Sequence, residues 1–440
     1  MRYVASFIAA VGLGACVPTA EPLPVTPSSP AIALEARADA LFATPAASHD
    51  LSGTLLVRSN GRTVFERRYG YADYNTGAAH SVHTRYAAAS VTKGLTAAAV
   101  IKLVRAGKLD LDDHVAKFLP ALAPLPAVSI AQVLDHTAGL PRDLPDGWQS
   151  ASVSDWLAAN PDALGPVGGE VYSNVGYALL AEIVEAAGGE NFARFTEASV
   201  LGPAGMDESV IDPDVPPAGL ASPHTAGPEP SDVQTAPDAP LEPGASGLVT
   251  SARDLALWAE ALAGGAYPEF FVPDDPLGSV DRGSASLGEY VSVQGSLPGY
   301  SANAIAWNEG RDSVVFVGNL FSYPALSMKA DLRALVGMEE VAMKTIRPSA
   351  VQETSMHRAL LGRYDSADFG PVEIFEEPQT DTIRLKMIGR PAYWSFHLTP
   401  IETGFHWRAF DRLIELRAGE TVMLRRGREE PELMARRAKN

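Results

Sequence analysis

Strand-like segments flank a long helical region in the middle of the chain, and this order constrains the fold most. Residues 51–69 hold two strand-like runs around Asn60-Gly61, which is a strong hairpin signal. From Ser90 to about residue 264 the apolar spacing is mainly helical, and strand-like runs return over residues 290–319. This order predicts one sheet built from pieces distant in sequence, with a helical region inserted between them.

Three other segments differ from this pattern. Apolar spacing over residues 31–43 predicts an amphipathic helix. Residues 211–246 contain nine prolines and no periodic spacing, and such a long irregular stretch is usually either functional or disordered. Short strand-like runs separated by turn residues fill about residues 350–430, which predicts a small antiparallel β module.

The N-terminus has the features of a secretory signal. Arg2 precedes an apolar run over residues 3–13, which is too short to span a bilayer. The run ends in Leu13-Gly14-Ala15-Cys16, which resembles the bacterial lipoprotein box and implies lipidation of Cys16. We therefore expect a signal peptide over residues 1–15, a Pro/Ser/Thr-rich tether over 16–30, and a location on the periplasmic side of the outer membrane. An ordinary cleaved signal with an incidental cysteine is the alternative.

Composition excludes several classes of function. The formal net charge of −18 argues against a nucleic-acid-binding surface, which needs clustered Lys and Arg. The nine histidines form no His-Glu-x-x-His motif or Cys/His cluster, so we expect neither a metal site nor another cofactor. Cys16 is the only cysteine, so the chain forms no intramolecular disulfide.

A hydroxyl and an amine lie three residues apart in Ser90-Val91-Thr92-Lys93. A helix that starts near Ser90 places both side chains on one face, because positions i and i+3 are neighbours. The first turn of such a helix also supplies unpaired N–H groups and the positive end of the helix dipole. This arrangement is typical of a nucleophile with its base and one donor for the oxyanion. A capped helix with an incidental Ser and Lys is the structural alternative.

Two later motifs add candidate site residues. In Tyr172-Ser173-Asn174, Tyr172 is a proton shuttle if neighbouring ammonium groups lower its pKa, and Asn174 offers both a donor and an acceptor. In Gln294-Gly295-Ser296, a strand ends in a glycine that permits close backbone approach, and an N–H near Ser296 is a second oxyanion donor. A packed loop tyrosine and an ordinary strand end are the structural alternatives.

The three motifs, in this order, resemble the serine β-lactamase and penicillin-binding-protein superfamily, specifically its class C-like branch with the family VIII esterases. The resemblance covers about residues 35–340. It implies an α/β fold with a β-lactamase-like antiparallel sheet, flanking helices and a helical insertion, over residues 31–345. Residues 346–440 resemble the small lipocalin-like β domain often appended to these enzymes. The supporting segments are residues 109–113, 133–141, 172–180, 203–206 and 245–255.

The resemblance also implies roles for individual residues. Ser90 is the acylated nucleophile, Lys93 takes or relays its proton, and Tyr172 performs general acid/base work on the leaving group. Asn174 positions the substrate and Lys93. The backbone N–H groups of Ser90 and Ser296 form the oxyanion hole, beside Gln294 and Gly295 in the substrate site. Because the identity of the base is disputed in related enzymes, we assign Lys93 and Tyr172 as a unit.

One departure from the family pattern concerns specificity. The third motif of the family usually begins with Lys or His, and alignment on Gly295 puts Val293 at that position. Valine cannot contact a substrate carboxylate. We therefore expect weak or absent activity on β-lactams and D-Ala-D-Ala peptides, and activity on small esters or amides that lack this carboxylate.

Other functional classes remain open at this stage. Asp135-His136 permits a Ser-His-Asp interpretation, but a structural histidine is favoured because the family uses this segment structurally. The chain lacks Gly-x-Ser-x-Gly, which argues against an α/β-hydrolase elbow. The leading hypothesis is an envelope esterase or amidase that forms an acyl-enzyme at Ser90. The alternatives are a D-Ala-D-Ala carboxypeptidase or class C-like β-lactamase, and a catalytically weak relative that binds envelope components.

Overall fold

The computed structural model describes most of the chain from residue 30 onward. The predicted signal peptide, Cys16 and the tether up to residue 29 lie outside the described residues, and so does the predicted domain boundary at residues 345 and 346. The described ranges are 30–145, 152–212, 216–227, 232–237, 241–272, 277–322, 328–340, 350–352, 354–367, 369–378, 382–392, 394–408, 412–417, 420–425 and 432–436.

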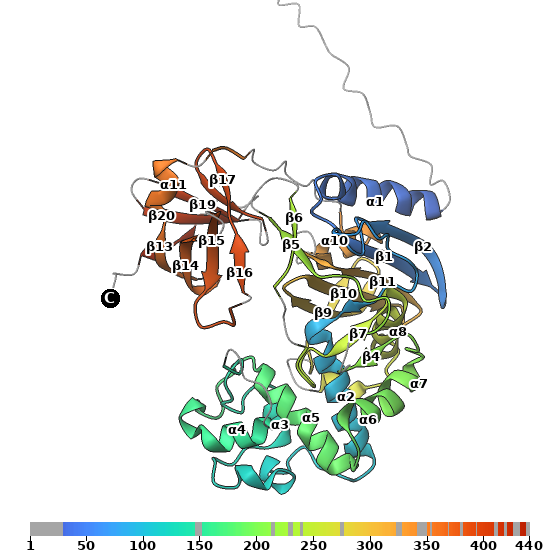
Figure 1. Ribbon diagram of the computed structural model, residues 1–440. Coiled ribbons are helices and arrows are strands. Elements are labelled where there is room, and N and C mark those ends of the chain that lie inside the picture. Colours follow the sequence, from blue (N-terminus) through green and yellow to red (C-terminus); the bar gives the residue numbers. More distant parts are fainter. Residues whose placement is uncertain are drawn as a thin grey trace, which may run out of the picture.

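A six-stranded antiparallel sheet forms the centre of the hydrolase part (Figure 1). Its N-terminal hairpin confirms the prediction from Asn60-Gly61, and β1 pairs directly with β11 from the far end of the domain. The sheet therefore closes on pieces that are distant in sequence, as expected. In spatial order the strands are β2 (Arg62–Tyr69), β1 (Gly53–Ser59), β11 (Asp312–Gly318), β10 (Tyr300–Trp307), β9 (Gly288–Leu297) and β8 (Val280–Ala285).

Helices cover both faces of this sheet. On one face, α1 (Pro30–Ala47) and α10 (Met328–Leu335) bury residues such as Phe42 and Leu332 against Phe316 of β11. On the other face, α8 (Ala252–Ala263) packs on β10 and β11 and buries Trp258 completely. The hydroxyl of Ser251 caps α8 by accepting the N–H of Asp254, which fits the sequence signal for a helix start.

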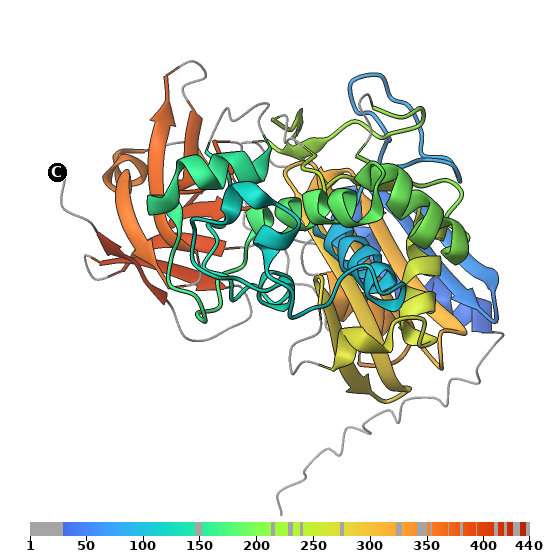
Figure 2. The ribbon, with the colours of Figure 1, turned by 90° about the horizontal axis from the view of Figure 1, so that it is seen from below.

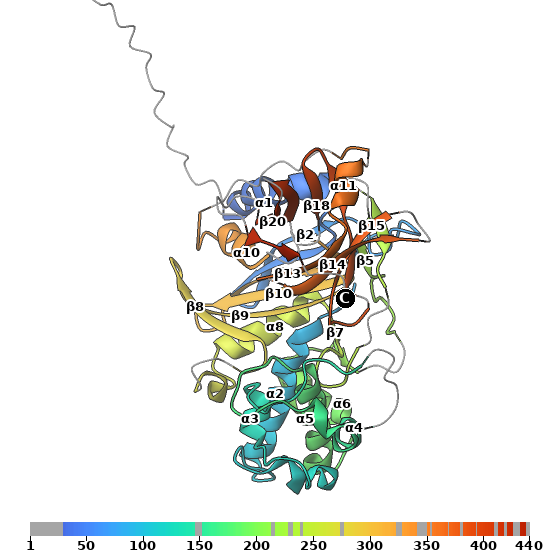
Figure 3. The same ribbon diagram turned by 90° about the vertical axis from the view of Figure 1, so that its left-hand side faces the viewer.

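The helical region forms a second body below the sheet (Figures 1 and 3). Its core belongs to one apolar cluster that continues through α8 to the central sheet, and Leu180 and Ile183 are fully buried in it. The helix expected near Ser90 begins at Thr92, after a 3₁₀ turn over Ala89–Val91. The helices are α2 (Thr92–Arg105), α3 (Ile130–Leu134), α4 (Val153–Ala159), α5 (Asn174–Gly188), α6 (Phe192–Thr196) and α7 (Gly202–Ala204), with a π-helix over Glu197–Leu201 and 3₁₀ turns over Val115–Lys117, Pro120–Leu122, Pro161–Ala163 and Pro268–Phe271.

Two small three-stranded sheets lie beside the central one. The sheet that contains β5 and β6 corrects the interpretation of residues 211–246 as an irregular loop. That segment contains two strands, which pair with each other because extended backbone between prolines can still form a short ladder. The small sheets are β12 (Leu320–Phe321), β5 (His224–Ala226) and β6 (Val233–Thr235), and β3 (Tyr86–Ala87), β7 (Leu248–Thr250) and β4 (Val210–Ile211).

The C-terminal part consists of two five-stranded antiparallel sheets that enclose their own apolar core, which includes Phe405 and Trp407. A short helix, α11 (Ser355–Ala359), precedes them. We call this unit the C-terminal β module. Its sheets are β16 (Ser395–His397), β15 (Thr382–Met387), β14 (Gly370–Glu377), β13 (Gly362–Ser366) and β22 (Ala435–Arg436), and β17 (Thr399–Ile401), β18 (Gly404–Trp407), β19 (Arg412–Arg417), β20 (Glu420–Arg425) and β21 (Glu432–Leu433).

Buried contacts hold the module against the hydrolase part. Arg408 donates to Asp50 at 2.8 Å, and both side chains are almost completely buried. Arg408 also donates to the carbonyl of Gly227 at 2.9 Å, and Phe396 stacks on Phe321 of β12 with ring centroids 5.2 Å apart. Seen from below, with the helical region in front, the module lies on the left and the central sheet on the right (Figure 2). No described helix is long and apolar enough to cross a membrane.

Candidate active site

The turn that carries Ser90 is held in an unusual backbone conformation. Ala89 has φ +50° although it has a side chain, and such strain persists only where the surrounding structure imposes it. Thr92 fixes the turn from both sides, because its hydroxyl donates to the carbonyl of Ala89 at 2.7 Å and accepts the N–H of Leu248 at 2.9 Å. Ser90 is thereby presented at the start of α2 with its side chain half-buried.

Lys93 lies directly beside Ser90 and is completely buried. Its ammonium donates to Ser90 Oγ at 3.3 Å and to the carbonyl of Ala245 at 2.9 Å. It also lies 5.0 Å from the ring centroid of Tyr172 and 5.7 Å from that of Tyr177. The i, i+3 spacing therefore produces the contact predicted from the sequence.

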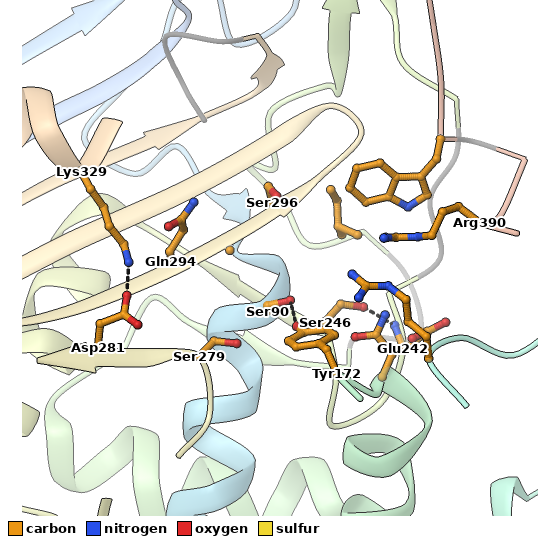
Figure 4. Close-up of a pocket in the computed structure, with 15 residues that line it drawn as sticks. Ser90, Tyr172, Glu242, Ser246, Ser279, Asp281, Gln294, Ser296, Lys329 and Arg390 are labelled. Atoms are coloured by element: carbon orange, nitrogen blue, oxygen red, sulfur yellow. Dashed lines mark hydrogen bonds and ion pairs between the residues drawn. The ribbon is translucent and has the colours of Figure 1, made fainter. Parts of the chain in front are cut away.

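Tyr172 completes the group, because its hydroxyl lies 2.7 Å from Ser90 Oγ (Figure 4). Burial alone raises the pKa of Tyr172. The positive charge of Lys93, with hydrogen bonds from Lys93, Ser90 and Ser279, outweighs burial, so the pKa of Tyr172 lies below its ordinary value. The structure thus brings the three predicted catalytic side chains together, with a phenol tuned to carry a proton.

Asn174 is the first residue of α5, which Ser173 caps by accepting the N–H of Gly176. The amide nitrogen of Asn174 donates to Asp143 at 2.5 Å, and its side chain lines the cleft next to Ser90. The polar contacts described for Lys93 are with Ser90, Tyr172 and Ala245, so a role of Asn174 in positioning Lys93 stays a prediction.

The end of β9 passes directly over the Ser90 turn. A Cβ at Gly295 would lie 2.1 Å from the carbonyl oxygen of Ala88 and 2.8 Å from the nitrogen of Ser90, so only glycine fits. Leu297 and Tyr300 close a two-residue hairpin and form its hydrogen-bonded pair, so Ser296 and Ser301 form the next, non-hydrogen-bonded pair. The backbone N–H of Ser296 therefore points away from β10, toward the β8 side of β9. The pairing of β8 with β9 does not extend beyond Val293, so β8 does not cover this N–H.

These residues line a cleft with a volume of about 310 Å³ (Figure 4). Gln294, Gly295 and Ser296 form one wall, whereas Val293 is 1% exposed and belongs to the core. Sequence reasoning missed several residues that complete the lining, because they come from loops, from β8, β9 and α10, and from the C-terminal β module, which lie far apart in the sequence. These are Arg142, Glu242, Ser246, Ser279, Asp281, Leu297, Lys329, Arg390 and Trp394.

Charged groups in the cleft are arranged in opposed pairs. Lys329 forms an ion pair with Asp281 beside Gln294, on the opposite side of the cleft from Arg390 (Figure 4). Arg390 Nε lies 3.4 Å from Asp143, and the guanidinium of Arg142 lies 4.8 Å from the ring centroid of Tyr172. The cleft therefore contains cations even though position 293 is a valine. Two of them, Lys329 and Arg390, already face carboxylates of the protein.

His136 acts as a structural side chain in this arrangement. Its Nδ1 accepts the N–H of Ser173 at 3.1 Å, and its ring packs 4.7 Å from that of Tyr172. Burial and the charge of Lys93 lower the pKa of His136 to about 4, so the ring is neutral at pH 7. Among the residues that the structure describes, no group of three or more His, Cys, Asp and Glu side chains could hold a metal ion.

Comparison with known proteins gives the family. The β-lactamase family model matches residues 38–337. Penicillin-binding protein 4* of Bacillus subtilis (strain 168) is 34% identical over 184 residues, which are 39% of this chain and 40% of that protein. The esterase EstB of Burkholderia gladioli is 29% identical over 290 residues, or 60% of this chain and 74% of the esterase.

A solved structure extends the likeness in fold to the C-terminal β module. The crystal structure of SurE aligns with a TM-score of 0.58 and 24% identity, covering 92% of this chain and 99% of SurE. By contrast, the chain spans less than half the length of penicillin-binding protein 4* in the match to that protein. The fold, the site and the family match together show that this chain belongs to the β-lactamase family of serine hydrolases.

Proposed function

We propose that this protein is an esterase or amidase that acts on small acyl substrates through an acyl-enzyme at Ser90. The contact of 2.7 Å between Ser90 Oγ and the Tyr172 hydroxyl, with Lys93 at 3.3 Å, carries the proposal. Nucleophile and base lie within hydrogen-bonding reach, and a buried cation stabilises the phenolate that accepts the proton. The match to the esterase EstB supports the ester as the first substrate to test.

The mechanism follows from these positions. As Ser90 Oγ attacks the acyl carbon, its proton passes to Tyr172, and the developing oxyanion accepts the N–H groups of Ser90 and Ser296. Collapse of the tetrahedral intermediate breaks the bond to the leaving group, which takes the proton from Tyr172. Water then attacks the acyl-enzyme and gives a proton to Tyr172. Collapse of this second tetrahedral intermediate breaks the bond to Ser90 Oγ, which takes that proton from Tyr172, so the acid leaves and Ser90 is regenerated.

Charge pairing in the cleft supports substrates without a carboxylate. Asp281 faces Lys329 and Asp143 faces Arg390, so an anionic substrate competes with carboxylates that are already in place. Arg142 also lies near a carboxylate, with its Nε 3.6 Å from Asp143, but its side chain is 42% exposed and stacks on Tyr172, so it stays accessible to a substrate. This residue favours a peptide carboxylate as the second candidate and keeps carboxypeptidase or β-lactamase activity as the alternative.

A fluorophosphonate probe tests the proposal. We expect the full chain to be labelled and Ser90→Ala to be unlabelled. Ser199→Ala, whose hydroxyl donates to the carbonyl of Phe195 in the helical region, is the matched control and should be labelled like the wild type. We also expect faster turnover of short-chain p-nitrophenyl esters than of nitrocefin. Absence of labelling in all three proteins would favour the non-catalytic binding relative, and equal turnover would favour the β-lactamase.

We further propose a lipid anchor at Cys16 and a location in the bacterial cell envelope, on the periplasmic side of the outer membrane. The sequence Leu13-Gly14-Ala15-Cys16 after a short apolar run supports this proposal. We expect the wild type to incorporate radiolabelled palmitate and to sediment with membranes, and Cys16→Ser to do neither. Equal sedimentation of both proteins would argue against lipidation.

A further inference from the structure

The C-terminal β module reaches the cleft through the segment between β15 and β16. Two described side chains of this segment, Arg390 and Trp394, line the cleft with Ser90 and Tyr172. The Arg390 guanidinium lies 4.4 Å from the ring centroid of Trp394, and that ring meets Phe321 of β12 edge-on at 5.9 Å. Arg390 is therefore held by a stack that begins in the hydrolase part, and it enters the cleft opposite Lys329 (Figure 4).

Asp143 connects Arg390 with Asn174. Its Oδ1 accepts the amide N–H of Asn174 at 2.5 Å, and its Oδ2 lies 3.4 Å from Arg390 Nε. The side chain of Asp143 is only 9% exposed, so its charge depends on protein partners for stabilisation. Because an ionised carboxylate only accepts hydrogen bonds, Asp143 turns the NH₂ group of Asn174 toward itself and leaves Oδ1 of Asn174 for the other side.

The surroundings of Asp143 make Arg390 its principal cationic partner. Arg142 Nε lies 3.6 Å from Asp143, but that side chain is 42% exposed and stacks on Tyr172. The Arg390 side chain is 20% exposed and lies closer. Glu242 adds a second carboxyl nearby, and the negative charge of Asp143 acts on it. A charge at Asp143 thus requires a fixed cation, which the C-terminal β module supplies.

We propose that Arg390 is a positioning residue of the active site, which fixes the orientation of the Asn174 amide through Asp143. The C-terminal β module then forms part of the catalytic apparatus. This inference rests on the proposed function, because it concerns the placement of Asn174 beside the acylated serine. It assigns no direct contact between Arg390 and the substrate.

A mutant cycle in the full-length protein tests this inference with p-nitrophenyl butyrate. Arg390→Ala should lower kcat/KM about tenfold, an effect between those of an exposed and a fully buried ion pair, mainly through kcat. Arg390→Lys keeps the charge and should recover part of the loss. Asn174→Ala should lose activity alone, and the double variant should be no slower than Asn174→Ala, because Arg390 acts through Asn174. Arg358→Ala, which removes an exposed ion pair with Glu376 in the same module, should match the wild type.

Several outcomes would overturn the inference. Additive losses in the double variant would mean that Arg390 touches the substrate or supports the fold by itself. Wild-type rates for Arg390→Ala or for Asn174→Ala would also overturn the inference, because neither side chain would then contribute to catalysis. If Arg390→Ala fails to fold in a thermal melt, the cycle of Arg390→Lys with Asn174→Ala decides by the same criterion. Fluorophosphonate labelling separates the two proposals, since an unlabelled wild type refutes the proposed function and labelling with an additive cycle refutes only the role of Arg390.

Discussion

Gly295→Ala is the substitution that most directly tests how the strand end and the Ser90 turn cooperate. The new Cβ would lie 2.1 Å from the carbonyl oxygen of Ala88 and 2.9 Å from the nitrogen of Val91. An ordinary van der Waals contact begins at 3.4 Å. The distance from the new Cβ to the Ala88 oxygen must therefore grow by about 1.3 Å, so the strand and the turn must separate by about this amount. Both atoms belong to the backbone, so no side-chain rotation relieves the clash.

This separation moves the N–H of Ser296 away from the oxyanion that forms on Ser90. Because a misplacement of about 1 Å can cost about 100-fold in rate, we expect kcat/KM for p-nitrophenyl butyrate to fall about 100-fold, or about 2.7 kcal/mol. Fluorophosphonate labelling should slow by a similar factor. Gly169→Ala is the control, since its nearest contact is an ordinary 4.0 Å from the oxygen of Pro166. Wild-type labelling by a Gly295→Ala protein with an unchanged melting temperature would refute this account of the oxyanion hole.

Three other substitutions test separate parts of the structure. Tyr172→Phe should lower kcat by a factor of about 10²–10⁴ with little change in KM. In the wild type, kcat/KM should rise with pH as Tyr172 loses its proton at a pKa below its ordinary value, and the variant should lack this rise. An unaltered pH profile would exclude Tyr172 as the base. Burial raises the pKa of Asp212 to about 7, so the folded chain retains a proton that the unfolded chain loses, and stability falls as pH rises from about 4 to 7. Asp212→Asn should therefore raise the melting temperature at pH 8 more than at pH 4, and an equal change at both would contradict this. Arg408→Ala leaves Asp50 buried without its ion-pair partner, which should lower the free energy of unfolding in urea by about 3–5 kcal/mol. Arg417→Ala, which removes a more exposed ion pair, should lower it far less. Equal losses would argue against a stabilising role of the buried pair.

Short-range patterns allowed much of the fold and site to be predicted. The Asn60-Gly61 hairpin depends on turn chemistry, and the contact of Lys93 with Ser90 depends on helical spacing, so both can be read from a few residues. The edge strand β8 was missed because its residues Asp281, Arg282 and Ser284 give no apolar alternation.

Long-range placement was beyond the sequence patterns. Arg390 follows Ser90 by 300 positions and belongs to a separate β module, so no local spacing indicates that both line one cleft. The sequence also did not indicate that Val293 is a core residue, because its burial depends on the register between β9 and β10. The absence of a basic residue at position 293 is visible in the sequence, whereas the cations that a loop, α10 and the C-terminal β module bring to the cleft could be found only in three dimensions.

The pairing of β1 with β11 has a consequence for how the chain folds. Residues 53–59 find their partners at 312–318, so a chain emerging from its N-terminus carries an apolar edge strand until most of the domain exists. Contacts of such long range slow folding, because the loop between them loses entropy before any pairing energy is gained. Meanwhile the exposed backbone of Gly53–Ser59 is a template for wrong pairing between chains. If the proposed secretory signal is used, a central sheet that can close only after nearly all of its strands are present would keep the chain unfolded for passage across a membrane.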